Sequence, residues 1–219
     1  MKKFNLIFAV VALFAVACQN ENTLDGVLQG FENPVVEQTH NEFNNLIAEQ
    51  NGKFSDEEFI NALTKSVLTY SKDDVLFYFD DGSVGDSVIC EGSWTTNKFL
   101  FFDNGEYWAC YDAFYMAAID DFKPMDGAFR SEWSYDAETN VLTVFNHDWC
   151  AGQFGKVECK SEVLYFDGKQ FIVKGKFYPS DSSENLHTIY AVRRFTIEDG
   201  RNEAIEKYST DLREYTVSH

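Results

Sequence analysis

The sequence predicts a mainly β protein: an antiparallel up-and-down meander, closed as a barrel or folded as a sandwich, with a helical N-terminal segment and a C-terminal helix. Three observations predict this class. Beyond residue 73, β-branched and aromatic residues dominate and alternate with polar residues at period two. Short Asn-Gly and Asp-Gly turns separate the runs. Finally, 45% of the 219 residues are hydrophobic and 16% are aromatic, which is enough to bury a sizeable core.

The chain begins with the pattern of a signal peptide. Lys2 and Lys3 precede an apolar run over residues 4–17. This run is shorter than the roughly 20 residues that a permanent membrane-spanning helix needs. We therefore expect residues 1–17 to be removed from the mature protein.

Two forms of processing fit the residues Ala15-Val16-Ala17-Cys18. The small residues fit ordinary cleavage, which would release a soluble protein. They also resemble the bacterial lipobox, in which the cysteine is diacylated on sulfur and becomes the first residue, although that motif most often has Leu where Ala15 stands. Assigning Cys18 to lipid leaves four cysteines, an even number for an oxidising compartment. The sequence therefore predicts a lipid anchor, with acyl chains such as palmitate, on Cys18.

The lipobox resemblance implies a lipoprotein held at the envelope of a Gram-negative cell. Each buried methylene of the acyl chains contributes about 0.8 kcal/mol, so several chains anchor stably without a basic patch. Gln19, in place of Asp, implies export to the outer membrane, with the periplasmic and the surface orientations both left open. Loss of Lys2 and Lys3 takes the formal net charge from −18 to −20. This acidity excludes a nucleic-acid partner, because binding phosphates requires clustered Lys and Arg.

Four regions follow from the changes in pattern: a signal peptide at 1–17, a lipidated cysteine and tether at 18–34, a helical subdomain with a lead-in strand at 35–87, and the barrel with its C-terminal helix at 88–219. The tether also fits an arm packed on the domain, because it contains Leu24, Val27, Leu28 and Phe31. In the subdomain, a first helix is expected to end near Asn51-Gly52. A second helix starts at a capping box of Ser55 and Glu58. Its apolar stripe is Phe59, Leu63, Val67 and Tyr70.

The expected strands of the meander are 75–79, 90–102, 105–112, 114–118, 128–136, 140–148, 157–166, 169–178 and 186–197. Asn104-Gly105 and Asp167-Gly168 mark the strongest hairpins, because both turn residues accept positive φ. A C-terminal helix is expected over residues 202–215. One face of it carries Ile205, Tyr208, Leu212 and Tyr215.

Gly92-Ser93-Trp94, at the start of the first long strand, looks like the G-x-W signature of lipocalins and lipocalin-like bacterial lipoproteins. In that family an Arg from the last strand covers the Trp at the base of the barrel. Here Arg193 and Arg194 lie in the last predicted strand, and which of them faces Trp94 is left open. The resemblance covers about residues 88–215 and implies a lipocalin-like barrel, although the two preceding helices depart from it. The alternative is an unrelated β-sandwich in which Trp94 is a core aromatic.

A barrel of about eight strands holds either packed side chains or one small ligand. The candidate ligand-lining residues are Trp108, Trp133, Tyr111, Phe145, Tyr165 and Tyr190. The same rings can fill the interior, and aromatic stripes at strand spacing favour a packed or narrow one.

The cysteines predict disulfides. Cys150 and Cys159 flank a loop between two expected strands, where a disulfide would contribute about 2.5 to 3 kcal/mol in the chain-entropy model. The other candidates, Cys90 and Cys110, would then join neighbouring strands. Four cysteines allow three connectivities, and free thiols are a further alternative.

No motif in the sequence names a catalytic residue, a cofactor or a metal site. His147 and Cys150 point to opposite faces of a strand, so they are poorly placed to hold one cation. The acidic turns at 80–86 and 120–127 lack the twelve-residue calcium loop with its terminal Glu. We therefore expect no enzyme activity and no cofactor.

Two functions fit this sequence. The leading hypothesis is an anchored module whose barrel binds a small apolar molecule, or a glycan stacked on Trp and Tyr, near the membrane. The alternative is a structural or interaction subunit with a packed barrel that docks on another envelope protein.

Overall fold

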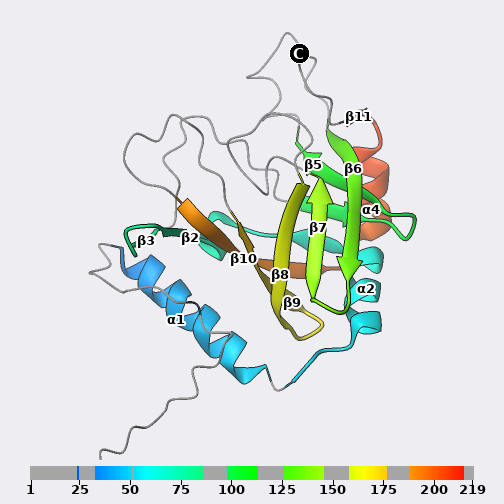
Figure 1. Ribbon diagram of the computed structural model, residues 1–219. Helices are drawn as coiled ribbons and strands as arrows, with labels where there is room; N and C mark the ends of the chain where they lie inside the picture. Colours follow the sequence, from blue (N-terminus) through cyan, green and yellow to red (C-terminus); the bar gives the residue numbers. More distant parts are fainter. Residues whose placement is uncertain are drawn as a thin grey trace, which may run out of the picture.

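The computed structural model describes Leu24 and residues 33–50, 52–85, 98–112, 126–145, 158–176 and 188–214. Its helices are α1 (Pro34–Glu49), α2 (Asp56–Lys65) and α4 (Arg201–Tyr208), with a short 3-10 helix η1 (Lys72–Asp74). Its strands are β1 (Val67–Thr69), β2 (Val75–Phe79), β3 (Val84–Gly85), β4 (Lys98–Phe101), β5 (Glu106–Tyr111), β6 (Gly127–Asp136), β7 (Val141–Phe145), β8 (Glu158–Phe166), β9 (Gln170–Lys176), β10 (Thr188–Glu198) and β11 (Leu212–Glu214). The mainly β class, with helices near both ends of the chain, is confirmed (Figure 1).

Eight strands close into an antiparallel barrel in the order β1-β4-β5-β6-β7-β8-β9-β10, and β1 pairs back onto β10. One edge of β10 pairs with β9. The other edge is long enough to pair with two strands, first with β2 and then with β1. Arg193 lies opposite Val75 of β2, and Glu198 lies opposite Val67 of β1. The barrel is thus compatible with a lipocalin-like one. The expected domain boundary between residues 87 and 88 would divide the sheet, because β1 and β2 lie before it and the other barrel strands after it.

The two predicted hairpins form, with a different turn from the one expected. At the first, Gly105 has φ +83° while Asn104 keeps a negative φ, and the Gly105 N–H donates to the Phe102 carbonyl at 3.0 Å. The Asn104 side chain instead accepts the Glu106 N–H at 3.0 Å. Only the glycine of each pair takes a positive φ, and at the second hairpin it is Gly168 at +85°. A turn with one left-handed residue suits this loop length, because the glycine adds a bulge that matches the strand twist.

The expected strands that lie in described residues are confirmed, and that at 75–79 matches β2 at both ends. The strand expected at 114–118 lies outside the described residues. Two helical expectations are wrong. α2 ends at Lys65, and Val67 belongs to β1, because the barrel needs this strand between β4 and β10 to close.

The C-terminal helix also ends earlier than expected, at Tyr208. Residues Leu212–Glu214 form β11, which runs parallel to β6. Asp211 turns the chain onto that strand, since its carbonyl accepts the Ala128 N–H at 2.9 Å. A Cβ at Gly127 would lie 2.3 Å from the same carbonyl, so this approach requires glycine.

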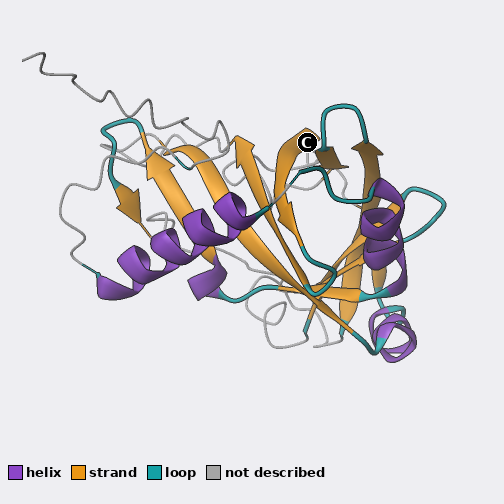
Figure 2. Cartoon of the chain, turned by 90° about the horizontal axis from the view of Figure 1, so that it is seen from below, coloured by secondary structure: helices purple, strands orange, loops and turns teal. Residues whose placement is uncertain are grey.

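Three apolar clusters organise the molecule. The interior cluster joins the inward faces of the barrel strands to Phe59 and Leu63 of α2. The second cluster packs α1 on the outside of β2, β8, β9 and β10. The third packs α4 on the outside of β4, β5 and β6. Figure 2 shows α1 lying along one side of the strands, with the two shorter helices together at the other side.

Candidate functional site

The barrel interior beside α2 is filled by aromatic rings. Phe59 of α2 enters this end and meets the rings of Tyr135, Phe166 and Phe171 at centroid distances of 5.1, 5.2 and 5.4 Å. Trp133 packs edge-on against Phe101 at 5.2 Å. Its indole N–H donates to the Phe102 carbonyl at 2.9 Å, so its polar atom is satisfied. A ligand would have to displace these rings to enter here.

Several inward positions farther from α2 carry small side chains, and Arg193 lies among these positions. They are Ala109, Ser131, Ser161, Gly175, Ala191 and Arg193, all buried. Phe129 and Tyr111 place two rings in the same part of the barrel. A Cβ at Gly175 would lie 2.4 Å from the Ser161 hydroxyl, so β8 and β9 approach closely at that pair. Arg193 is only 3% exposed. Away from α2 the interior therefore combines small residues, a buried cation and two rings.

Three candidate ligand-lining residues lie outside the barrel, so the prediction that they line a cavity is wrong. Trp108 packs beneath α4, and its indole N–H donates to Glu106 at 2.6 Å. Tyr165 and Tyr190 pack in the cluster beneath α1. Strand alternation places Trp108 outward, between inward Tyr107 and Ala109. In β8 a register shift between Val163 and Tyr165 turns Tyr165 outward.

The other three candidates do not meet in one site either. Trp133 faces inward as part of the filled end. The Tyr111 hydroxyl donates to Asp211 at 2.7 Å, and its ring lies 5.2 Å from that of Phe129. Phe145 follows inward Val144, so alternation places it on the outer face.

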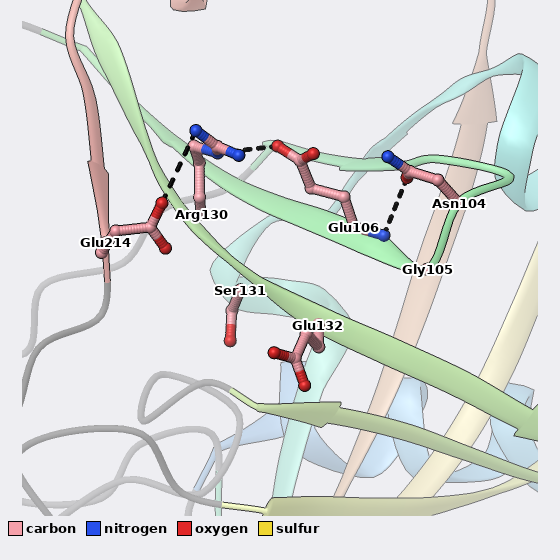
Figure 3. Close-up of a pocket in the computed structure, with 7 residues that line it drawn as sticks. All are labelled: Asn104, Gly105, Glu106, Arg130, Ser131, Glu132 and Glu214. Carbon is pink, nitrogen blue, oxygen red and sulfur yellow. Dashed lines mark hydrogen bonds and ion pairs between the residues drawn. The ribbon is translucent and has the colours of Figure 1, made fainter.

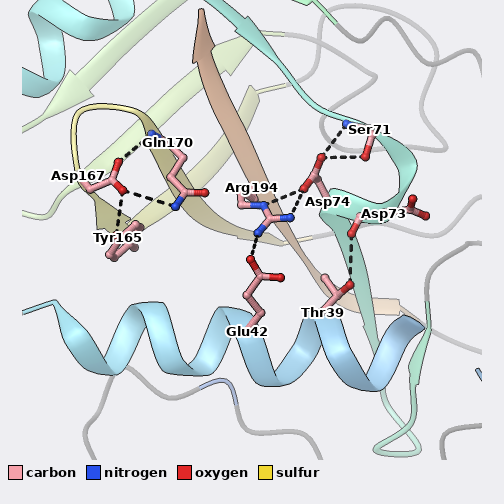
Figure 4. Close-up of polar contacts among 9 residues, drawn as sticks. All are labelled: Thr39, Glu42, Ser71, Asp73, Asp74, Tyr165, Asp167, Gln170 and Arg194. Carbon is pink, nitrogen blue, oxygen red and sulfur yellow. Dashed lines mark hydrogen bonds and ion pairs between the residues drawn. The ribbon is translucent and has the colours of Figure 1, made fainter. Parts of the chain in front are cut away.

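Arg193 and Arg194 have opposite surroundings. Arg193 follows the inward alternation of β10, whereas Arg194 lies outside and joins three elements (Figure 4). Its guanidinium pairs with Asp74 of η1 at 2.6 Å and with Glu42 of α1. Despite its partial burial, these two carboxylates raise the pKa of Arg194. Arg193 is therefore the inward-facing residue of the pair; Gly92 and Trp94 lie outside the described residues.

The cysteines follow the prediction in part. Cys159 is disulfide-bonded, and its predicted partner, Cys150, lies outside the described residues. Cys110 is a buried free thiol, so the candidate disulfide with Cys90 is wrong. Trp108 and Tyr208 enclose Cys110 in the cluster beneath α4. Burial raises the pKa of the Cys110 thiol, which leaves it protonated and unreactive at neutral pH.

A hollow of about 280 Å³ opens on the outer surface, at the hairpin between β4 and β5 and along β6 (Figure 3). Arg130 lies between two carboxylates there, 2.8 Å from Glu106 and 3.5 Å from Glu214. Although burial opposes it, hydrogen bonds from Trp108 and Arg130 lower the pKa of Glu106. Glu132 also lines the hollow. The polar groups largely satisfy one another, and none of the predicted ligand-lining rings is among the residues that line the hollow.

A polar chain that the sequence analysis missed lies beneath α1. His40 is 3% exposed, and its Nδ1 lies 2.9 Å from the Tyr78 hydroxyl. Its Nε2 lies 2.9 Å from the Asn44 amide nitrogen, and the Asn44 oxygen accepts the Leu24 N–H at 3.0 Å. Burial lowers the pKa of His40. Helical spacing could have revealed it, because His40 falls on the apolar face of Val36, Phe43 and Ile47.

No group of described His, Cys, Asp and Glu side chains has the arrangement of a metal site. Among the helices of the described residues, none has the length and apolar character needed to cross a bilayer.

The chain matches no protein-family model, no curated protein and no solved structure.

Proposed function

We propose that this protein is a lipid-anchored module of the outer membrane that docks on another envelope protein through the outside of a packed barrel. One observation carries the choice of a packed barrel: the rings of Phe59, Phe101 and Trp133 occupy the interior beside α2. Three candidate ligand-lining residues lie outside the barrel beneath the helices. The role is one of binding, since no sequence motif names a nucleophile or a general base.

The anchor is argued from the N-terminal sequence alone. Residues 1–17 have the charge and length of a signal peptide, and Cys18 follows the small residues typical of a lipobox. Lipid on Cys18 would leave an even number of cysteines, which favoured the anchor only if all four formed disulfides. Because Cys110 is a free thiol, this number no longer supports the anchor. The motif and its place directly after the apolar run are the remaining support for lipid on Cys18.

The partner is expected to present a basic surface. A mature charge of −20 repels acidic surfaces and speeds encounter with basic ones. The hollow beside β6 is part of this acidic exterior, with Glu106, Glu132 and Glu214 around a single arginine. Such an association would weaken as salt screens the charges.

A second candidate function rests on the small inward residues. The inward positions near Arg193 include Ala109, Ala191 and Gly175. Their side chains occupy less volume than the rings beside α2 do. A small apolar molecule or a glycan would bind in this part of the barrel. This candidate keeps the anchor and replaces the protein partner with a small ligand.

Native mass spectrometry of the protein, extracted from its own membrane in mild detergent, tests both candidates. We expect the acylated chain in a salt-sensitive complex with a basic envelope protein, and we expect Cys18→Ala to lose the acyl mass. A stoichiometric small molecule that is lost in Ala191→Leu would contradict the packed barrel and support the second candidate. Ala48→Leu is the matched control, because Ala48 is exposed on α1. Acyl mass that persists in Cys18→Ala would rule out the anchor.

A further inference from the structure

We propose that His40 is a pH-sensitive latch, which holds Leu24 against α1 near neutral pH and releases it on acidification. Leu24 is buried in the cluster beneath α1, and its backbone N–H donates to Asn44. Asn44 in turn contacts His40. The backbone hydrogen bond of Leu24 is thus linked through Asn44 to one buried imidazole.

The hydrogen bonds assign the protonation state of this imidazole. The Leu24 N–H can only donate, so the Asn44 oxygen must face it and the Asn44 NH₂ must face His40. The Nε2 atom of His40 therefore accepts a hydrogen bond and carries no proton. Its Nδ1 carries the proton and donates to the Tyr78 hydroxyl at 2.9 Å. The docked Leu24 therefore selects the neutral imidazole in one tautomer.

Protonation of His40 would place two hydrogen-bond donors opposite each other. An N–H at Nε2 would face the Asn44 NH₂, which is also a donor. Rotation of the Asn44 amide would present its oxygen to His40, but it would then turn the NH₂ toward the Leu24 N–H. One of the two contacts is lost in either orientation, and leaving a buried donor unsatisfied is costly. Acidification therefore disfavours the docked position of Leu24.

The charged groups around His40 are engaged with one another. From η1 and β10, Asp74 and Arg194 pair, and Arg194 also holds Glu42 of α1. The Tyr190 ring stacks on the Tyr78 ring with 4.5 Å between their centroids. The Lys174 ammonium of β9 lies 4.3 Å from the centroid of the Tyr190 ring. The remaining acidic groups on these elements are Glu37 and Glu49 of α1, Asp73 of η1 and Glu198 at the end of β10. Burial is the cause that lowers the pKa of His40.

The direction of the pH effect follows from this lowered pKa. Docking contributes fully above the ordinary histidine value of 6.5. It weakens as the pH falls below that value, because the released state binds the proton more readily. If Cys18 carries lipid, the docked Leu24 lies six residues from the anchor, a reach of about 20 Å at most. That consequence rests on the proposed anchor, whereas the latch does not.

Hydrogen exchange of the full-length chain tests the latch. The exchange rate of the peptide that contains Leu24 is measured at about pH 7.5 and about pH 5, each divided by the rate of the same free peptide at that pH. In the wild type we expect the corrected rate to rise about fivefold or more at the lower pH, the equivalent of one hydrogen bond lost. An equal corrected rate at both values overturns the proposal.

Three variants separate His40 from other titrating groups. In Asn44→Asp the carboxylate accepts both the Leu24 N–H and a protonated Nε2, so protection is expected to persist at the lower pH. Asn45→Asp is the matched control, because Asn45 is exposed, and it should respond as the wild type does. His40→Gln does not titrate in this range, so its corrected rate should not change with pH. A wild-type rise in Asn44→Asp or His40→Gln overturns the proposal.

Discussion

At the scale of single residues, the side of the strand decides what each aromatic does. In β5, Tyr107 faces the filled interior, while its neighbour Trp108 lies under α4. Both rings are large and apolar with one polar atom, so composition does not distinguish them. Phe59 is the interior ring that comes from a helix, and it meets rings from three strands.

Phe59→Ala should therefore be strongly destabilising. We expect a loss of about 3–5 kcal/mol in the free energy of unfolding, because the surrounding strands cannot collapse into the space. Urea denaturation followed by circular dichroism measures it. The matched control is Ile60→Ala, whose residue is 37% exposed and should change stability by about 0.5 kcal/mol or less. Equal effects of the two substitutions would contradict the placement of Phe59 inside the barrel.

At the scale of elements, polar contacts attach the outer pieces to the barrel. Arg194 joins α1 and η1 to β10, and the Thr39 hydroxyl contacts the Asp73 carbonyl at 3.5 Å. At the other end, Asp211 brings β11 to β6 through the Tyr111 hydroxyl and the Ala128 N–H. A hydrogen bond from Arg213 lowers the pKa of Asp211, which keeps this carboxylate charged.

Gly127→Ala should release β11. The added Cβ would lie 2.3 Å from the Asp211 carbonyl and 2.5 Å from the Tyr111 hydroxyl, so the C-terminal segment must move away. We expect a loss of about 1–3 kcal/mol and faster hydrogen exchange in the peptide over residues 211–214. Ser134→Ala, at an exposed position of the same strand, is the control and should leave exchange there unchanged. Unchanged exchange in Gly127→Ala would mean that β11 does not depend on this close approach.

At the scale of the whole molecule, strong negative charge opposes the compact barrel. The formal net charge is −18, from 36 acidic and 18 basic residues. Exposed ion pairs such as Lys65–Asp103 offset little of this repulsion, since each contributes about 0–1 kcal/mol. Closure of the sheet and three apolar clusters therefore provide most of the stability.

Added salt should raise the thermal midpoint. Going from about 0.01 to about 0.15 M NaCl shortens the screening length to about 8 Å and weakens the repulsion among carboxylates. We expect an increase of about 2–4 °C, which corresponds to about 1 kcal/mol for a chain of this size. Scanning calorimetry at constant pH measures it, with KCl as a control for the identity of the cation. A fall in the midpoint would mean that the ion pairs outweigh the net repulsion.

The sequence by itself determined the class of the fold and most of the strands. Alternation and glycine turns are local signals, so β2 and the hairpins at Gly105 and Gly168 could be predicted from neighbouring residues. It also offered an arm packed on the domain as the alternative to a tether, and Leu24 of that segment is buried. These features depend on contacts within a few residues along the chain or on composition.

Only the tertiary structure decided how the barrel closes and which residues meet. Val67 fits a helical stripe, yet it lies in β1 because β10 and β4 leave a strand position open there. The same applies to Tyr165, which a register shift turns outward, and to His40, whose partner Tyr78 is 38 residues away. The physical reason is that pairing across distant strands fixes register and sidedness, and a single residue of shift reverses which side chains face the core.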